Sequence, residues 1–174
     1  MNSLDIKISP LDGWEKKIST TGSTNYDSEY DDINTLLADI CDALSESEVV
    51  EFLVSGFGQN NWPVDVATDM LCVVEQLNDI LEKISVGRFD FYLDFYEQGM
   101  ERKLEFRSLA NTVEVKCFSD TTWEPNVANL CLDKAQVRDM FFNLKLTFCS
   151  VAKIVCPLFC SHSWFSEWEN TGQA

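Results

Sequence analysis

Carboxylates are the side chains of this sequence best placed to do chemistry, and half of them lie in one stretch. Between Ile18 and Glu82 there are 14 Asp and Glu residues and no Lys, Arg or His. This stretch carries −14 of the net charge of −16. Charge segregated in this way builds a field on one side of a molecule, and such a field steers cationic partners. The 14 acids are Asp27, Glu29, Asp31, Asp32, Asp39, Asp42, Glu46, Glu48, Glu51, Asp65, Asp69, Glu75, Asp79 and Glu82.

Metal-binding and catalytic patterns are weak in this sequence. Cys156, Cys160 and His162 form C-x3-C-x-H with Cys149 upstream, but this is not a recognised zinc spacing, and a structural site needs four ligands in tetrahedral reach. His162 is the only histidine, and nothing marks a group that would orient it beside a nucleophile. Paired carboxylates for acid–base work stay an alternative, because so many acids pair easily by chance. We expect no catalysis, no cofactor and no metal.

Two segments interleave tyrosine with carboxylates. The first is YDSEYDD, from Tyr26 to Asp32, and the second runs along one face of a predicted strand. Tyrosine offers a rigid contact area with a polar tip and is enriched at interface hot spots. The second segment comprises Asp90, Tyr92, Asp94 and Tyr96. For that segment the alternative is a face covered by a helix, or acids paired with cations of neighbouring strands, namely Lys103, Arg107 or Lys116.

Two predicted helices position the acidic stretch. Apolar residues recur at helical spacing over Glu29–Leu44, with Ser28 as the N-cap. A second helix opens at Pro63 and closes at Gly87. On both helices the acids gather opposite the apolar face, without cations one turn away to relieve them. These acids are Asp31, Asp32, Asp39, Asp42 and Glu46 on the first helix, and Asp65, Asp69, Glu75, Asp79 and Glu82 on the second. The alternative is that each face is merely solvated.

Five strands and a third helix complete the predicted elements. Residues 89–96, 102–109 and 112–119 alternate as an antiparallel meander, followed by a loop over 120–132. Leu4–Ile8 and Glu48–Phe57 are strands that could pair at either edge of this meander. A capping box of Asp133 and Gln136 predicts a long buried helix to about Val155. The period-two alternation over residues 142–148 leaves a strand as the alternative there.

These elements predict an α+β fold with one domain over residues 1–174. Its antiparallel sheet combines the central three-stranded meander with one or two N-terminal strands, and it packs against two or three helices. The length fits one domain, and a hydrophobic content of 45% is enough for a core. Residues 19–28 read as a polar linker and residues 157–174 as a tail. Trp164 and Trp168 in that tail could dock on the body or on a partner.

The sequence also predicts a cytoplasmic protein. Asp5 and Lys7 stand where a signal peptide would need an apolar core. No window approaches the ~18 uninterrupted apolar residues of a membrane span. The seven cysteines are an odd number on apolar faces, which indicates reduced thiols. We therefore expect no membrane partner, and the oligomeric state stays open.

Three classes of function fit an acidic, non-catalytic protein. The first is an inhibitor of a basic enzyme such as a nuclease, whose positive charge holds phosphates and whose capture is accelerated by a complementary field. The second is a nucleic-acid mimic that occupies a DNA-binding protein, which predicts evenly spaced carboxylates along an elongated surface. The third is a scaffold or regulatory subunit whose acidity serves solubility. Direct binding of nucleic acid or of anionic membranes is disfavoured by repulsion.

In size, α+β character, acidity and its two acidic-aromatic segments, the chain resembles bacterial immunity proteins that accompany polymorphic or contact-dependent growth-inhibition toxins. The resemblance covers the whole chain in general character and transfers no residue by motif. It implies a toxin–antitoxin pair, with a cognate toxin domain encoded nearby that this protein neutralises by binding. The candidate partner-binding residues are Tyr26, Glu29, Tyr30, Asp31, Asp32, Asp39, Asp42, Glu46, Asp65, Asp69, Asp90, Tyr92, Asp94 and Tyr96.

Overall fold

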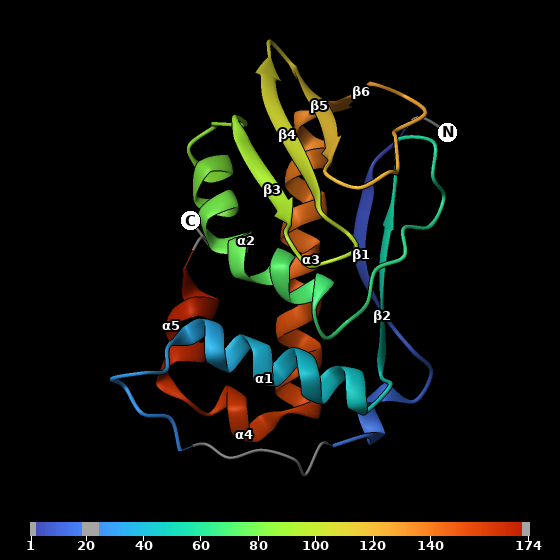
Figure 1. The fold of residues 1–174 in the computed structure, drawn as a ribbon. Coiled ribbons are helices and arrows are strands. Elements are labelled where there is room, and N and C mark those ends of the chain that lie inside the picture. Colours follow the sequence, from blue (N-terminus) through green and yellow to red (C-terminus); the bar gives the residue numbers. More distant parts are fainter. Residues whose placement is uncertain (1–2, 19–24, 172–174) are drawn as a thin grey trace.

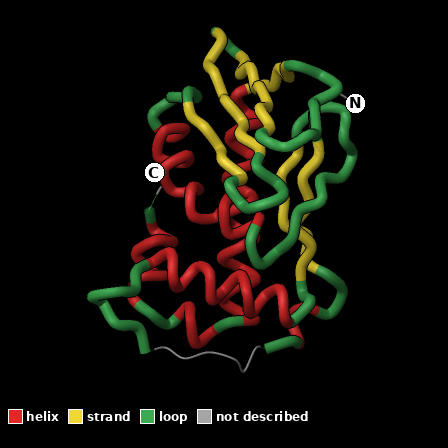
Figure 2. Tube along the Cα trace, in the orientation of Figure 1, coloured by secondary structure: helices red, strands yellow, loops and turns green. Residues whose placement is uncertain are grey.

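Two antiparallel sheets share a long central helix in the computed structural model, which describes residues 3–18 and 25–171. Figure 1 shows this helix, α3 (Lys134–Val155), running behind the larger sheet. Helices α1 (Ile33–Glu46) and α2 (Asp69–Ser85) pack against it and against each other. The predicted α+β class is confirmed. Figure 2 shows α1, α4 and α5 gathered at the end of the molecule away from the larger sheet, while α3 extends behind that sheet.

The smaller sheet pairs β1 (Asp5–Pro10) with β2 (Val50–Ser55) in antiparallel register. Ile6 and Ile8 on β1 are buried, as are Phe52 and Val54 on β2, because both strands alternate with period two against the core. These strands were expected at an edge of the meander. They pair with each other instead. This pairing gives the main-chain N–H and C=O groups along one edge of each strand hydrogen-bond partners, while the apolar faces of both strands pack on the core.

The larger sheet follows chain order through β3 (Phe91–Phe95), β4 (Arg102–Leu109), β5 (Thr112–Ser119) and β6 (Asn129–Asp133). The predicted meander is confirmed as its first three strands. The prediction of a loop throughout 120–132 is wrong at its end, where β6 pairs with β5 and buries Leu130 and Leu132. Two alternating apolar residues give too weak a signal to predict a strand from sequence.

Aromatic contacts join the larger sheet to α3. Phe91 and Phe106, on neighbouring strands, stack with ring centroids 4.5 Å apart. Phe141 of α3 meets both rings edge-on at 5.7 Å. The predicted capping box starts this helix, because the Asp133 N–H donates to Gln136 Oε1 at 3.0 Å. The helical reading of residues 142–148 is therefore confirmed over the strand alternative.

Both earlier helices begin later than predicted. The N-cap of α1 is Asp32, not Ser28, and Asp32 Oδ1 accepts from the N–H groups of Asn34 and Thr35. The second helix does not open at Pro63. Asp65 holds that preceding segment in a turn by accepting from the Thr68 N–H at 2.7 Å, so α2 starts at Asp69. Asp is as good an N-cap as Ser, and local contacts decide between such candidates.

The segment expected to be a tail instead forms α4 (Pro157–Cys160) and α5 (Ser163–Asn170), joined to the body. Phe159, Phe165 and Trp168 are buried there, so the apolar residues after Pro157 continue the core. Of the predicted linker, residues 19–24 lie outside the described residues, and 25–28 have no helix or strand. A short 3-10 helix, η1 (Trp14–Lys16), follows β1.

Candidate docking surface

Helix α1 carries exposed acids of the acidic stretch on its outer side. Leu36, Ile40 and Leu44 are fully buried, because they form the apolar face that packs inward. Asp42 and Glu46 are exposed on the opposite side and make no hydrogen bond or ion pair with another residue that the structure describes. These two carboxylates are free to meet a partner.

The α1 carboxylates repel one another. Partial burial is the largest cause that raises the pKa of Asp42, and the charges of Asp39 and Glu46 raise it further. A raised carboxylate pKa means that the folded protein holds the charged form at a cost. A cation from a partner would relieve this repulsion.

The cations of the chain lie elsewhere. Within residues 3–18 and 25–171, the ion pairs join the following residues: Lys7–Asp5, Lys103–Asp94, Arg107–Glu105, Lys116–Glu114, Arg138–Asp139 and Lys153–Glu169. None of these pairs uses an acid from the stretch between Ile18 and Glu82. Lys17 Nζ donates to the main-chain oxygens of Ser47 and Glu48 at the end of α1, and not to a carboxylate. The acidic stretch is thus left without an internal counter-charge.

Tyr26 anchors the N-terminal acidic segment to the C-terminal helices. Its hydroxyl donates to Asp39 Oδ2 at 2.6 Å, and its ring lies 5.4 Å from His162 and 5.6 Å from Trp164. Burial, followed by the bond to Asp39, raises the pKa of Tyr26 well above its ordinary value. Tyr26 and Asp39 therefore stabilise the fold, and neither is free in the way that Asp42 is.

Tyr30 directly precedes Asp31, which lines a hollow between this segment and α5. Its side chain is 80% exposed, and Glu29 beside it is exposed too. The hollow, of about 520 Å³, is lined by Ser28, Asp31, Asp32, Ile33, Asn78, Trp164, Glu167, Trp168 and Thr171. Indole faces and carboxylates together suit a Lys or Arg side chain. Glu167 and the two tryptophans were not among the predicted contact residues, since only the fold brings them here.

The predicted acids at the start of α2 serve that helix. Asp69 is only 4% exposed; its Oδ2 accepts from the Asp65 N–H at 2.9 Å and its Oδ1 has no partner among the described residues. Burial raises the pKa of Asp69 against the lowering effect of that bond, and the charges of Asp65 and Glu97 raise it further. Asp65 is likewise occupied with Thr68.

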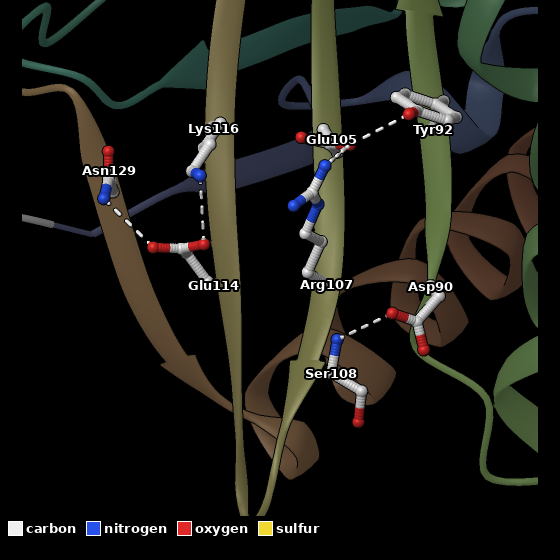
Figure 3. A network of polar contacts seen from close by, with 8 residues as sticks. All are labelled: Asp90, Tyr92, Glu105, Arg107, Ser108, Glu114, Lys116 and Asn129. Carbon is white, nitrogen blue, oxygen red and sulfur yellow. Dashed lines mark hydrogen bonds and ion pairs between the residues drawn. The ribbon is translucent and has the colours of Figure 1, made fainter.

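The acidic-aromatic face of β3 is bonded to the neighbouring strand, and Figure 3 shows this for Asp90 and Tyr92. Asp90 Oδ1 accepts from the Ser108 N–H at 3.1 Å, and Asp94 pairs with Lys103 at 2.8 Å. The Tyr92 hydroxyl donates to Glu105 at 2.8 Å, and Arg107 holds the same carboxylate at 2.7 Å. For Asp94, the structure therefore agrees with the alternative interpretation of the sequence, in which acids of this segment pair with cations of the neighbouring strands.

Tyr96, the last of the predicted contact residues, faces α2. Its hydroxyl donates to Glu75 Oε2. Burial, then this bond, raises the pKa of Tyr96 well above its ordinary value. Tyr96 ties β3 to α2. The predicted residues therefore divide among three places: α1 and its approach, the start of α2, and the outer face of the larger sheet.

His162 and the cysteines have structural surroundings. His162 Nδ1 accepts from the Trp164 N–H at 3.3 Å and caps α5. The cysteines are free thiols, of which Cys131 is exposed. Within the described residues, no three His, Cys, Asp or Glu side chains are grouped to hold a metal ion.

Comparison of the chain with protein-family models, curated proteins and solved structures found no match. No helix among residues 3–18 and 25–171 is long and apolar enough to cross a membrane. Function must therefore be argued from the surface itself.

Proposed function

We propose that this protein is a cytoplasmic immunity protein that binds and neutralises a cognate basic toxin, a nuclease being the class that its charge favours. It acts by binding, with no catalysis, cofactor or metal of its own. The observation that carries the proposal is that no cation of the described chain pairs with the acids between Ile18 and Glu82. We place the contact on Asp42 and Glu46 of α1 and on the exposed Tyr30 in the segment that precedes this helix.

Physical chemistry supports this assignment. A cationic nuclease surface is built to hold phosphates, and carboxylates held near one another at a cost gain most from such a surface. Complementary fields raise association rates to ~10⁸–10⁹ M⁻¹s⁻¹ at low salt, which suits interception of a toxin before it acts. Tyr30, 80% exposed, adds aromatic contact area beside the acids of its segment.

The test is the double variant Asp42→Lys/Glu46→Lys, assayed against the toxin-like domain that the proposal expects beside this gene. The association rate should fall about 10-fold to 1,000-fold at low salt. The difference should shrink as the Debye length shortens to ~8 Å at physiological ionic strength. The toxin should also be inhibited stoichiometrically by the unaltered protein.

The matched control is Asp120→Lys/Glu124→Lys, which changes net charge equally on exposed residues outside the acidic stretch. If the control slows association as much as the α1 variant does, net charge and not this surface governs binding. If neither variant changes the rate, the acidic surface is not the contact. A neighbouring gene product that binds nothing would remove the immunity assignment itself.

A further inference from the structure

Among residues 3–18 and 25–171, no strand pairs with the edge of β1 that faces away from β2. Strand β1 pairs with β2 from Asp5↔Ser55 to Pro10↔Val50, and the next pair continues this ladder because the Leu11 N–H donates to the Val49 oxygen at 2.9 Å. In an antiparallel ladder, hydrogen-bonded and non-hydrogen-bonded pairs alternate. The odd-numbered residues of β1 therefore bond to β2, and the main-chain groups of Ile6 and Ile8 point the other way.

The opposite strand confirms this direction. Val54 lies opposite Ile6, and its main-chain oxygen accepts from the Trp62 N–H at 2.8 Å, outside the β1–β2 pair. Within the described residues, no hydrogen bond ends on the outward N–H or oxygen of Ile6 or Ile8. Such a row of donors and acceptors is a template for another strand.

There is space beside this edge. A groove of about 270 Å³ separates β1 from α3, lined by Asp5, Ile6, Lys7, Ile8, Met140, Asn143, Leu144 and Thr147. Figure 1 shows that β1 is the strand of the smaller sheet nearer to α3. A strand added to β1 would lie ~4.8 Å away, over the α3 side of this groove.

We propose that a second copy of this chain occupies the edge, with β1 pairing antiparallel to β1 about a two-fold axis. Charge selects the register. With Ile6 opposite Ile6 of the second copy, Asp5 lies opposite Lys7 twice, in non-hydrogen-bonded pairs whose side chains approach closely. The nearest alternative registers place Asp5 opposite Asp5, or Lys7 opposite Lys7, and both are repulsive.

Other features of β1 agree with this register. Ile8 then pairs with Leu4 of the second copy, and the buried apolar faces of the two sheets continue into each other. Pro10, which has no N–H to donate, lies beyond the paired residues 4–8. The Asp5 and Lys7 side chains are about half exposed and already form an ion pair at 3.0 Å, so four alternating charges would meet at the axis. Two small sheets become one four-stranded sheet covered by both α3 helices.

The test measures self-association of the full chain by sedimentation equilibrium up to about 1 mM. Asp5→Lys and Lys7→Asp each replace two attractive cross-strand pairs by repulsive ones, so each variant alone should dimerise about tenfold more weakly, or worse. An equimolar mixture of the two variants restores Lys opposite Asp in both pairs. The mixture should therefore dimerise at least as well as the unaltered protein.

The matched controls are Asp12→Lys and Lys16→Asp, which change net charge equally on exposed residues just beyond β1. Hydrogen exchange supplies a second readout, because the Ile6 and Ile8 amides should gain protection as concentration rises. An unaltered chain that stays monomeric throughout overturns the proposal. So does a dimer that the single substitutions leave unchanged, or one in which these two amides gain no protection, since it would use another surface. None of these outcomes depends on toxin binding.

Discussion

Lysine in place of Arg102 tests whether a stacked guanidinium holds two loops of this fold together. Arg102 is only 4% exposed, and its Cζ lies 3.5 Å from the Trp123 ring centroid and 4.4 Å from that of Trp62. Its Nη1 donates to Gln59 Oε1 at 3.0 Å, and its Nε has no partner among the described residues. Burial lowers the pKa of this guanidinium. No described carboxylate pairs with Arg102. The two indole rings must therefore offset the cost of burying its charge.

The magnitude follows from these contacts. A desolvated cation–π contact contributes ~2 kcal/mol, so two rings give Arg102 roughly 4 kcal/mol against the cost of burying its charge. An ammonium is a more strongly hydrated point charge and lacks the planar face that a guanidinium offers to an aromatic ring. Arg102→Lys should therefore lower the free energy of unfolding by about 3 kcal/mol. Arg102→Met loses the stacking but also removes a buried cation, so it should lie within about 1 kcal/mol of the unaltered protein.

The assay is urea denaturation at pH 7, followed by tryptophan fluorescence, to which Trp62 and Trp123 contribute, and by circular dichroism. The expected order of stability places the Met variant above the Lys variant. A Lys variant as stable as the unaltered protein would show that stacking geometry is unimportant here. A Met variant less stable than the Lys variant would show that the charge itself stabilises the site. Either result refutes the reasoning.

Two further predictions concern charge and backbone conformation. Partial or full burial raises the pKa of Asp42 and Asp69, so their contribution to stability is complete below the unfolded value near 4 and is lost as pH rises through the raised pKa. The urea midpoint should increase as pH falls from neutral toward about 4.5, and Asp42→Asn should flatten that slope; a midpoint that falls contradicts this. Gly58→Ala places a Cβ 2.5 Å from Asn126 Cβ at a φ of +85° and should cost about 2 kcal/mol or more. Gly99→Ala, at a φ of +100° in open space, should cost about 1 kcal/mol, and equal losses of unfolding free energy would contradict the steric argument.

The periodicity of apolar residues predicted helices and strands correctly where it extends over several repeats. The strands β3 to β5 and helix α3 follow alternation and helical spacing that span several repeats, and the capping box at Asp133 gave the start of α3. The predicted helix boundaries were wrong where two nearby residues are equally favourable N-caps. Ser28 and Asp32 are both good N-caps, and only the contacts of Asp32 with Asn34 and Thr35 separate them.

Contacts between distant parts of the chain could not be predicted from sequence. Lys145 is a polar residue within a mostly apolar helix, yet it is buried: its Nζ donates to Asn78 Oδ1 at 2.7 Å and to the Trp168 oxygen at 3.1 Å. Burial lowers the pKa of Lys145. This lysine ties α2, α3 and α5 together, and it explains why residues expected to be a tail belong to the body. Nothing in the local pattern at Lys145 indicates partners so far away in the sequence.

Counting acids in the sequence overstated the surface available to a partner. Helix starts attract Asp because it accepts hydrogen bonds from unpaired main-chain N–H groups, so Asp32, Asp65 and Asp69 are occupied in building α1 and α2. A helical-wheel argument cannot distinguish such acids from free ones, because both lie off the apolar face. Exposed acids without a side-chain partner among the described residues include Asp79 and Glu82 on α2, besides the two on which we place the contact, Asp42 and Glu46 of α1. A docking partner should therefore be more sensitive to those two residues than to any capping acid, whose substitution would lower stability before it affected binding.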